Sequence, residues 1–316
     1  MIGPGYADFP VAGCTMLTRV PKADIRKGMF VEAVECSAAA FGKRRFLLNS
    51  HQDYLAIQES PADFVVINTT YGTEAAPHSG QRPLTRAEKR AEAAATLTRS
   101  IKALKTELIT VVVGGKLNLE SLSKVVEEIG QADSETTSLF YDLTRFRQKD
   151  EALFQHSLAV GILMGKLGTA LELDTDTVAL LVLSGLLHDV GKLTLSKNIL
   201  QKQTPLTAVE RKLLRSHPQR GHHLLKRHVI VPDEVLDVCL HHHEALDGGG
   251  YPSGKSASEI SQMVRIATVC DAFDKLTTAR PGKNDRGVAE AIAWMFARDH
   301  QFDRKLVLRL GAIIDD

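Results

Sequence analysis

Hydrophobic and polar residues alternate in short runs near the start of the chain, from residue 17 to about residue 71. Alternation with a period of two between turn residues is typical of half-buried strands. Ser50 followed three residues later by Asp53 indicates a helix N-cap, and we expect a brief helix from there through Leu55. The pattern therefore predicts a small α+β N-terminal domain over residues 16–72, with strands at 29–34, 46–48 and 64–68.

The segments on either side of this domain are rich in glycine, proline and small polar residues. We expect residues 1–15 to form a disordered leader. Residues 73–84, which include Pro77, Gly80 and Pro83, are predicted to form a linker.

Beyond the linker the strand pattern disappears, and apolar residues recur with a helical period. The nearly all-apolar stretch 178–187 is too short to span a bilayer and predicts a buried helix, which Asp176 is expected to cap. Thr207 and Glu210 have the spacing of a capping box. The region 85–316 is thus predicted to be all-helical, with helices over 86–110, 119–129, 134–146, 153–171, 177–189, 207–216, 233–245, 261–277 and 288–297.

The composition of the chain mainly excludes classes of partner. A chain of 316 residues exceeds one typical domain, which agrees with two. The net charge of +1 provides no field that would attract a nucleic acid polymer or a membrane, so an anion site must be local. The four cysteines form no CxxC pair, and we interpret them as reduced thiols in a cytoplasmic protein.

Five short stretches of the helical region are rich in His and Asp. Each stretch is a weak signal alone. A histidine such as His156 is usually an ordinary core or surface residue. An aspartate such as Asp271 usually caps a helix or forms an ion pair. His217 precedes Pro218 and therefore has the alternative reading of a residue at a helix exit. The stretches are 156–157, 188–192, 216–218, 241–252 and 271–274.

Together the five stretches indicate a metal site. Asp189 ends a helix that is apolar nearly all round, and Asp271 follows another buried-looking run. A buried carboxylate is costly unless it is paired or bound to a metal. Histidines and carboxylates from several helices that converge in a bundle interior suit divalent transition metals. We favour a metal pair over a purely structural polar network.

These motifs resemble the HD-GYP family, bacterial phosphodiesterases of cyclic di-guanylate within the HD metal-phosphohydrolase superfamily. The resemblance covers about residues 150–303, and its long run ending in Gly-Tyr-Pro is far more specific than the His-Asp pair. Residues 17–72 also resemble the small uncharacterised domain often found ahead of these modules. The implied fold is mainly α, an HD-type helical bundle over residues 85–316 with its metal core at about 150–283. The motifs are 188–192 (HDVGK), 242–244 (HHE), 247–252 (DGGGYP), Asp271 and Arg280-Pro281.

The resemblance implies a two-metal site in which Asp189 bridges the ions and a bridging hydroxide attacks the phosphate. Some family members have a Glu that brings in a third metal, and here that position is Ala152. Five imidazoles suit iron or manganese, with zinc or nickel as alternatives, better than magnesium. The implied ligands are His156, His188, Asp189, His217, His242, His243 and Asp271.

The resemblance also implies the substrate contacts. Lys192 would act on the scissile phosphate, although its ordinary reading is a cation at a helix C-terminus. Arg280 and Lys283 match positions that hold the second phosphate and a guanine base. The loop with Gly250, Tyr251 and Pro252 would shape the pocket rim or dock a signalling-domain protein; a tight structural turn is the alternative.

The expected activity is hydrolysis of cyclic di-guanylate to linear pGpG, with further cleavage to GMP left open, and Asp189 and Lys192 are the expected catalytic residues. The chain departs from the family at Lys275, where a small Ala is usual, and at Gly282, where an aromatic is common. The alternatives are a nucleotide-sensing or scaffold module with little turnover, and an HD hydrolase of another nucleotide. A regulatory or dimerising role of the N-terminal domain, and with it a homodimer, is a further hypothesis.

Overall fold

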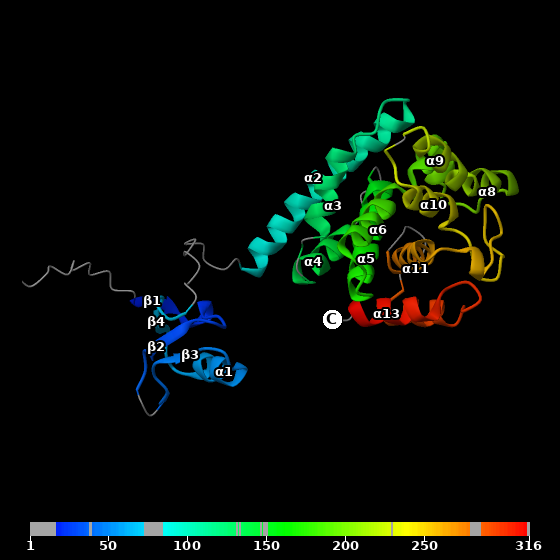
Figure 1. Ribbon diagram of the computed structural model, residues 1–316. Helices are drawn as coiled ribbons and strands as arrows, with labels where there is room; N and C mark the ends of the chain where they lie inside the picture. The colour runs from blue at the N-terminus through cyan, green and yellow to red at the C-terminus, as the bar shows by residue number, and fades with distance from the viewer. Residues whose placement is uncertain are drawn as a thin grey trace, which may run out of the picture. The chain divides into compact units, whose positions relative to one another are not determined.

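The computed structural model describes residues 17–37, 40–72, 85–130, 132, 134–145, 147, 151–228, 230–278 and 286–314. The chain divides into two compact units, residues 1–83 and 84–316, each with its own hydrophobic core (Figure 1). The expected leader at 1–15 and the expected linker at 73–84 lie outside the described residues.

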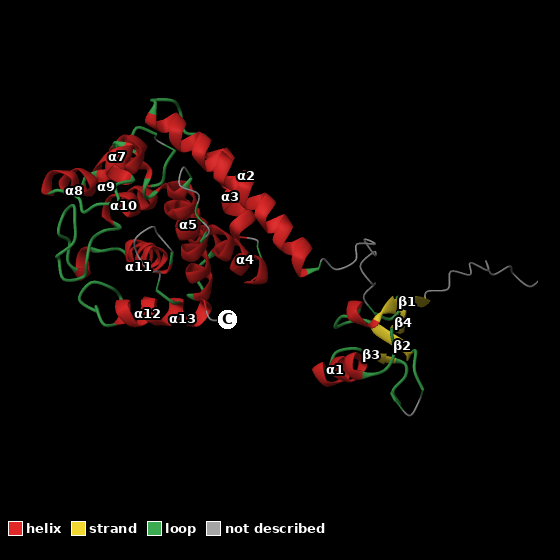
Figure 2. Cartoon of the chain, turned by 180° about the vertical axis from the view of Figure 1, so that it is seen from behind, coloured by secondary structure: helices red, strands yellow, loops and turns green. Residues whose placement is uncertain are grey.

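The N-terminal unit is a four-stranded antiparallel sheet with one α-helix (Figure 2). Val31, Val65, Ile67 and Ile57 are fully buried and form its core. The three expected strands are present, and β1 pairs with β4 along its whole length. The strands are β1 Leu17–Pro21, β2 Phe30–Val34, β3 Phe46–Leu47 and β4 Phe64–Asn68, in the sheet order β1-β4-β2-β3.

The single α-helix of this unit, α1, is longer than its sequence predicts. It spans His51–Glu59, and the Ser50 hydroxyl caps it by accepting hydrogen bonds from the backbone N–H groups of Gln52 and Asp53. The expected end at Leu55 is wrong, because Ile57 lies two residues further along, still within the helix, and is buried in the core.

The second unit is all-helical, as the periodicity predicts, and most expected boundaries hold within a few residues. Three short or terminal helices, α7, α9 and α13, were not expected. The helices are α2 Arg86–Val112, α3 Leu119–Gly130, α4 Ser134–Thr144, α5 Ala152–Ala170, α6 Thr175–Leu187, α7 Lys197–Leu200, α8 Ala208–Arg215, α9 His217–Leu225, α10 Asp233–His241, α11 Gln262–Thr277, α12 Val288–Phe296 and α13 Arg304–Ile314, with 3-10 turns η2 Val190–Thr194 and η3 Ala257–Glu259.

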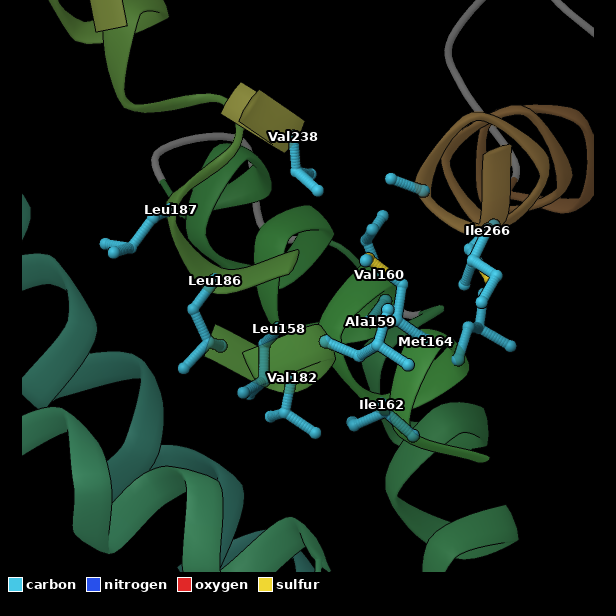
Figure 3. Close-up of a cluster of buried hydrophobic side chains, with 14 of the residues drawn as sticks. Leu158, Ala159, Val160, Ile162, Met164, Val182, Leu186, Leu187, Val238 and Ile266 are labelled. Atoms are coloured by element: carbon cyan, nitrogen blue, oxygen red, sulfur yellow. The ribbon is translucent and has the colours of Figure 1, made fainter. Parts of the chain in front are cut away.

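Helices α5 and α6 form the centre of this unit, where Leu158, Val182 and Leu186 are completely buried (Figure 3). The two helices approach closely through glycines: a Cβ atom added to Gly185 would lie 2.5 Å from the Cα of Gly161. The stretch Thr175–Thr194 is long and apolar enough to cross a membrane by length and composition, but 61% of its apolar window is buried inside the unit. It is therefore the buried helix that the sequence predicts.

The expected cap of α6 is wrong, and so is the alternative interpretation of His217 as a residue at a helix exit. The cap of α6 is Asp174, whose carboxylate accepts the N–H of Thr177, rather than Asp176, which lies inside the first turn. His217 does not leave a helix but begins α9, with Pro218 in the first turn, where a missing N–H costs nothing. The Thr207–Glu210 capping box is confirmed at the start of α8.

Candidate metal centre

Helix ends supply most of the predicted ligands. His188 and His242 are the residues at which α6 and α10 end, and His217 is the first residue of α9. His156 lies within α5 and Asp271 within α11, both on buried faces. The structure brings all seven predicted ligands together, and six of them are buried; the His243 side chain is 18% exposed.

Asp189 lies at the middle of this group, and its two carboxylate oxygens face different histidines. Oδ2 lies 3.3 Å from Nε2 of His156 and 3.4 Å from Nε2 of His188. Oδ1 lies 3.1 Å from Nε2 of His217 and 3.7 Å from Nε2 of His242. One carboxylate is thus shared by two separate sets of imidazoles.

The two oxygens of Asp189 face two groups of three residues, and a third candidate group, His188, Asp189 and His242, joins them. We call His156, His188 and Asp271 the mixed triad, in which Asp271 Oδ1 lies 3.0 Å from Nε2 of His156. We call His217, His242 and His243 the imidazole triad; Nε2 of His217 and Nε2 of His242 are 3.3 Å apart. Within each triad the candidate donor atoms lie within 4.8 Å of one another, a spacing that a single cation can bridge.

Four of the five imidazoles are anchored through Nδ1, which leaves Nε2 directed at Asp189. An Nδ1–H that donates to a fixed acceptor selects the tautomer whose Nε2 lone pair is free for a metal. The acceptors are the carbonyls of Gly185 for His188 at 2.8 Å, Leu214 for His217 at 2.6 Å and Cys239 for His242 at 3.1 Å, and the carboxylate of Asp274 for His156 at 2.6 Å.

Several buried polar atoms at the centre have no hydrogen-bond partner within the described part of the chain. They are Nε2 of His156 and of His188, and Oδ1 of Asp189 and of Asp271. Buried polar atoms are rarely left unpaired in folded proteins. Convergent imidazole and carboxylate lone pairs are the donor set of a transition metal, so these residues fit divalent cations.

Both central carboxylates are held ionised. Burial alone would raise the pKa of Asp189 and of Asp271, but nearby lysines and histidines lower both values well below the usual range. The ammonium of Lys192 contacts Asp189, and that of Lys275 lies 2.5 Å from Oδ2 of Asp271. The centre therefore presents two anionic ligands.

The two triads differ in how their imidazoles hold protons. Burial lowers the pKa of His217, lowers that of His242 to about 3, and lowers that of His243 well below its ordinary value. Burial also opposes protonation of His156 and His188, but the neighbouring carboxylates outweigh it and raise the pKa of His188 to about 9. In the absence of metal, the imidazole triad is thus the less basic of the two triads.

The remaining predicted residues are placed only in part. Lys192 lies in η2 beside Asp189, so it faces the centre instead of merely ending a helix. The Tyr251 ring stacks near His243, with ring centroids 4.8 Å apart, and the Arg215 guanidinium lies 4.8 Å from the Tyr251 centroid. Arg280 and Lys283 lie outside the described residues.

The loop that contains Gly250, Tyr251 and Pro252 also has a clear structural role. The Glu244 carboxylate accepts the backbone N–H groups of Ser253 and Lys255, so it holds the loop and does not point to the centre as a ligand. Of the three consecutive glycines, Gly248 has a positive φ of 76°. The loop can therefore be a tight structural turn and also lie beside His243 at the centre.

Sequence reasoning missed the contacts behind the ligands. Asp274 accepts from His156, and the Arg147 guanidinium binds the same Asp274 oxygen. Lys275 stood out only as a departure from the family. The signal was the spacing of Asp271, Asp274 and Lys275, which places all three on neighbouring positions of one helix face.

Comparison with known proteins identifies the family. The family described as the HD domain matches residues 144–306. The chain is 34% identical over 308 residues to the cyclic di-GMP phosphodiesterase PA4108 of Pseudomonas aeruginosa. The aligned region covers 91% of this chain and 74% of that protein. The chain is 30% identical over 197 residues to the cyclic di-GMP phosphodiesterase response regulator RpfG of Xanthomonas campestris pv. campestris, over 60% of this chain and 51% of that protein.

A solved structure shares the fold. Bd1817, an HDG"Y"P protein from Bdellovibrio bacteriovorus, aligns with a TM-score of 0.61 at 16% identity, over 95% of this chain and 100% of that one. The same family is indicated by the matched family model, by the relative that is covered over most of its length, and by the HDVGK and Gly-Tyr-Pro motifs in their order along the chain. The chain therefore belongs to the HD-domain family, as a member of its HD-GYP group.

Proposed function

We propose that this protein is a metal-dependent phosphodiesterase that hydrolyses cyclic di-GMP to linear pGpG and onward to GMP. The observation that carries the proposal is the division of Asp189, whose two oxygens face two separate triads. Relatives named as cyclic di-GMP phosphodiesterases support the choice of substrate.

The donor set supports two divalent ions, one at each triad with Asp189 between them. Two dications against the carboxylates of Asp189 and Asp271 leave a surplus of about two positive charges, which suits an anionic phosphodiester. Five imidazoles favour iron or manganese, with zinc or nickel as alternatives. When bound, such ions would polarise the phosphoryl oxygens and acidify the attacking water.

The protein's own groups bind and orient the phosphodiester. Three side chains of the centre are partly exposed to solvent: those of Lys192, His243 and Lys275 are 14%, 18% and 26% exposed. The Lys192 ammonium, held beside Asp189, is suited to stabilise charge that develops on the phosphoryl oxygens. Tyr251 and Arg215 lie next to His243 and offer a flat ring and a guanidinium to a base.

Product analysis tests the proposal. Protein purified without oxygen and loaded with Fe(II) or Mn(II) is expected to convert cyclic di-GMP to pGpG and GMP, measured by liquid chromatography. The double variant His188→Ala, Asp189→Ala is expected to form no product because both triads lose ligands. Turnover retained in this variant would contradict the proposal.

The same assay separates the alternatives. Tight binding of cyclic di-GMP without hydrolysis under every metal tested would indicate a nucleotide-sensing or scaffold module. Faster turnover of 3'3'-cGAMP, cyclic di-AMP or pGpG, measured in competition, would indicate an HD hydrolase with another substrate.

Three further features belong to the proposal. The loop with Gly250, Tyr251 and Pro252 is a docking surface for a signalling-domain protein, and the chain forms a homodimer. A cytoplasmic location agrees with the unpaired thiols of Cys36, Cys239 and Cys270.

A further inference from the structure

A buried row of charged groups contacts the mixed triad from the side away from Asp189. The proposed function assigns no role to this row. Asp274 is completely buried, and its Oδ2 lies 2.6 Å from Nδ1 of His156. The Arg147 guanidinium, itself only 9% exposed, binds the same oxygen. The hydroxyl of Thr278 lies 3.4 Å from Oδ1 of Asp274. The groups thus run in order from Arg147 through Asp274 to His156 and the centre.

This anchor differs from the others. His188, His217 and His242 donate through Nδ1 to main-chain carbonyls, which are neutral and come at no extra cost from the helices themselves. Among the described imidazoles of the centre, His156 alone donates to a charged carboxylate. Burying a carboxylate and a guanidinium is expensive, and a backbone carbonyl would orient the ring equally well.

The carboxylate changes the ligand chemically as well as orienting it. A carboxylate hydrogen-bonded to a ligand imidazole fixes the ring and makes its free nitrogen a stronger donor. The mixed triad also contains Asp271, which presents Oδ1 to His156 while Lys275 holds Oδ2. The imidazole triad contains no carboxylate among its three members; Asp189 lies 3.1 Å from His217, and Asp271 reaches only to 3.8 Å from Nδ1 of His243.

We propose that Asp274, held in place by Arg147, is a positioning residue that makes the mixed triad the stronger of two metal positions, so that this triad binds the first ion. The inference rests on the proposed function only in requiring a centre for two metal ions at these residues. It predicts stepwise filling of the centre, with the imidazole triad occupied second.

Metal titration of the full chain tests this inference. Mn(II) is added to metal-free protein, and binding is followed by calorimetry and by electron paramagnetic resonance, which distinguishes one isolated ion from a coupled pair. The wild type is expected to bind two ions in sequence. Asp274→Asn and Arg147→Met are each expected to weaken the first binding step by about 10- to 100-fold, with the second step little changed.

Arg145 provides the matched control. Its guanidinium also reaches α11, but it donates to the carbonyl of Thr277 and does not contact Asp274. Arg145→Met is therefore expected to lose a contact of the same kind while keeping the wild-type affinity for the first ion. Arg147→Lys, which keeps the cation, is expected to bind the first ion more tightly than Arg147→Met.

Thermal unfolding of each metal-free variant separates folding from metal binding. If Asp274→Asn does not fold, the comparison of Arg147→Lys and Arg147→Met with Arg145→Met decides the question. Wild-type affinities for both ions in folded Asp274→Asn or Arg147→Met protein would overturn the inference.

The outcome is separable from that of the proposed function. Turnover of cyclic di-GMP by the wild type, together with unaltered metal binding in the variants, would refute this inference and leave the function standing. Absent turnover with the expected loss of the first ion would refute the function and support this inference.

Discussion

The two central carboxylates, Asp189 and Asp271, are each contacted by a lysine. Two lysines each hold one of the central carboxylates: Lys192 contacts Asp189, and Lys275 contacts Asp271. Such contacts keep the acids ionised and orient the oxygens that face the histidines. Both lysines are partly exposed, with 14% of the Lys192 side chain and 26% of the Lys275 side chain accessible, so we expect them to be able to contact a phosphate.

The first prediction concerns Lys192. Lys192→Met is expected to lower kcat by about 10²- to 10³-fold, because a preorganised donor to the developing charge is lost. Metal content should stay at the wild-type level, since every predicted ligand remains. Steady-state kinetics and elemental analysis measure both quantities. Lys197→Met removes an exposed lysine of α7 and serves as the control; an equal loss of kcat there would contradict the prediction.

The second prediction concerns Lys275. Its side chain is 26% exposed, and loss of its ammonium is expected to weaken attraction of the anionic substrate by about 1 kcal/mol, which is roughly a fivefold rise in KM. The rise should shrink at high salt because screening already weakens the attraction in the wild type. KM measured for Lys275→Met at two salt concentrations tests this. An unchanged KM at low salt would exclude Lys275 from substrate attraction.

At the scale of elements, the ends and close contacts of helices position the ligands. Two ligands lie where α6 and α10 end, and η2 packs against α9 so tightly that a Cβ on Gly191 would lie 1.9 Å from the carbonyl oxygen of His217. The last turn of a helix leaves backbone carbonyls without an intrahelical partner, and these carbonyls can anchor side chains. The centre therefore depends on how closely α5, α6, η2, α9 and α10 approach one another.

The third prediction tests the contact between α5 and α6. Gly185→Ala places a methyl group 2.5 Å from Gly161 Cα, so the helices must separate. We expect a loss of about 1–3 kcal/mol in the free energy of unfolding, as overpacking usually costs. Metal affinity should fall too, because His156 and His188 move apart. Urea unfolding of the metal-free protein and metal titration measure the two effects.

Gly130→Ala is the matched control for this prediction. Gly130 is also helical, but a Cβ there meets nothing within 4 Å. Alanine has the higher helix propensity, so stability is expected to stay equal or rise by less than about 1 kcal/mol. Equal losses in the two variants would mean that the α5–α6 approach is not the cause.

At the scale of the whole molecule, the chain has two independent cores. The core of the N-terminal unit includes Val31, Ile57 and Ile67, and that of the helical unit surrounds α5 and α6. All the candidate metal groups found among the described residues belong to the helical unit. Nothing in the chemistry of the centre requires the sheet.

The fourth prediction follows from this division. A fragment of residues 85–316 is expected to unfold cooperatively and to bind metal as the full chain does, because its core and its ligands are self-contained. Thermal unfolding and metal titration of the fragment measure this. A fragment that is folded but binds no metal would show that the N-terminal unit takes part in the centre.

Periodicity alone was sufficient for the helical class and for the strands β2, β3 and β4, whereas the set of residues that meets at Asp189 was implied by the resemblance of its motifs to the HD-GYP family. Periodicity reports which faces are buried, and a buried carboxylate such as Asp271 requires a compensating group. It failed at helix ends: Asp174 and Asp176 are equally good capping residues, and only the geometry of the chain selects one.

Only the tertiary structure decided which oxygen of Asp189 faces which triad, and which group stands behind each imidazole. His156 and Asp274 are separated by 118 positions in the chain, and Arg147 and Asp274 by 127. Contacts at such separations depend on how helices pack and on which rotamers the packing permits. No local pattern of hydrophobic and polar residues carries that information.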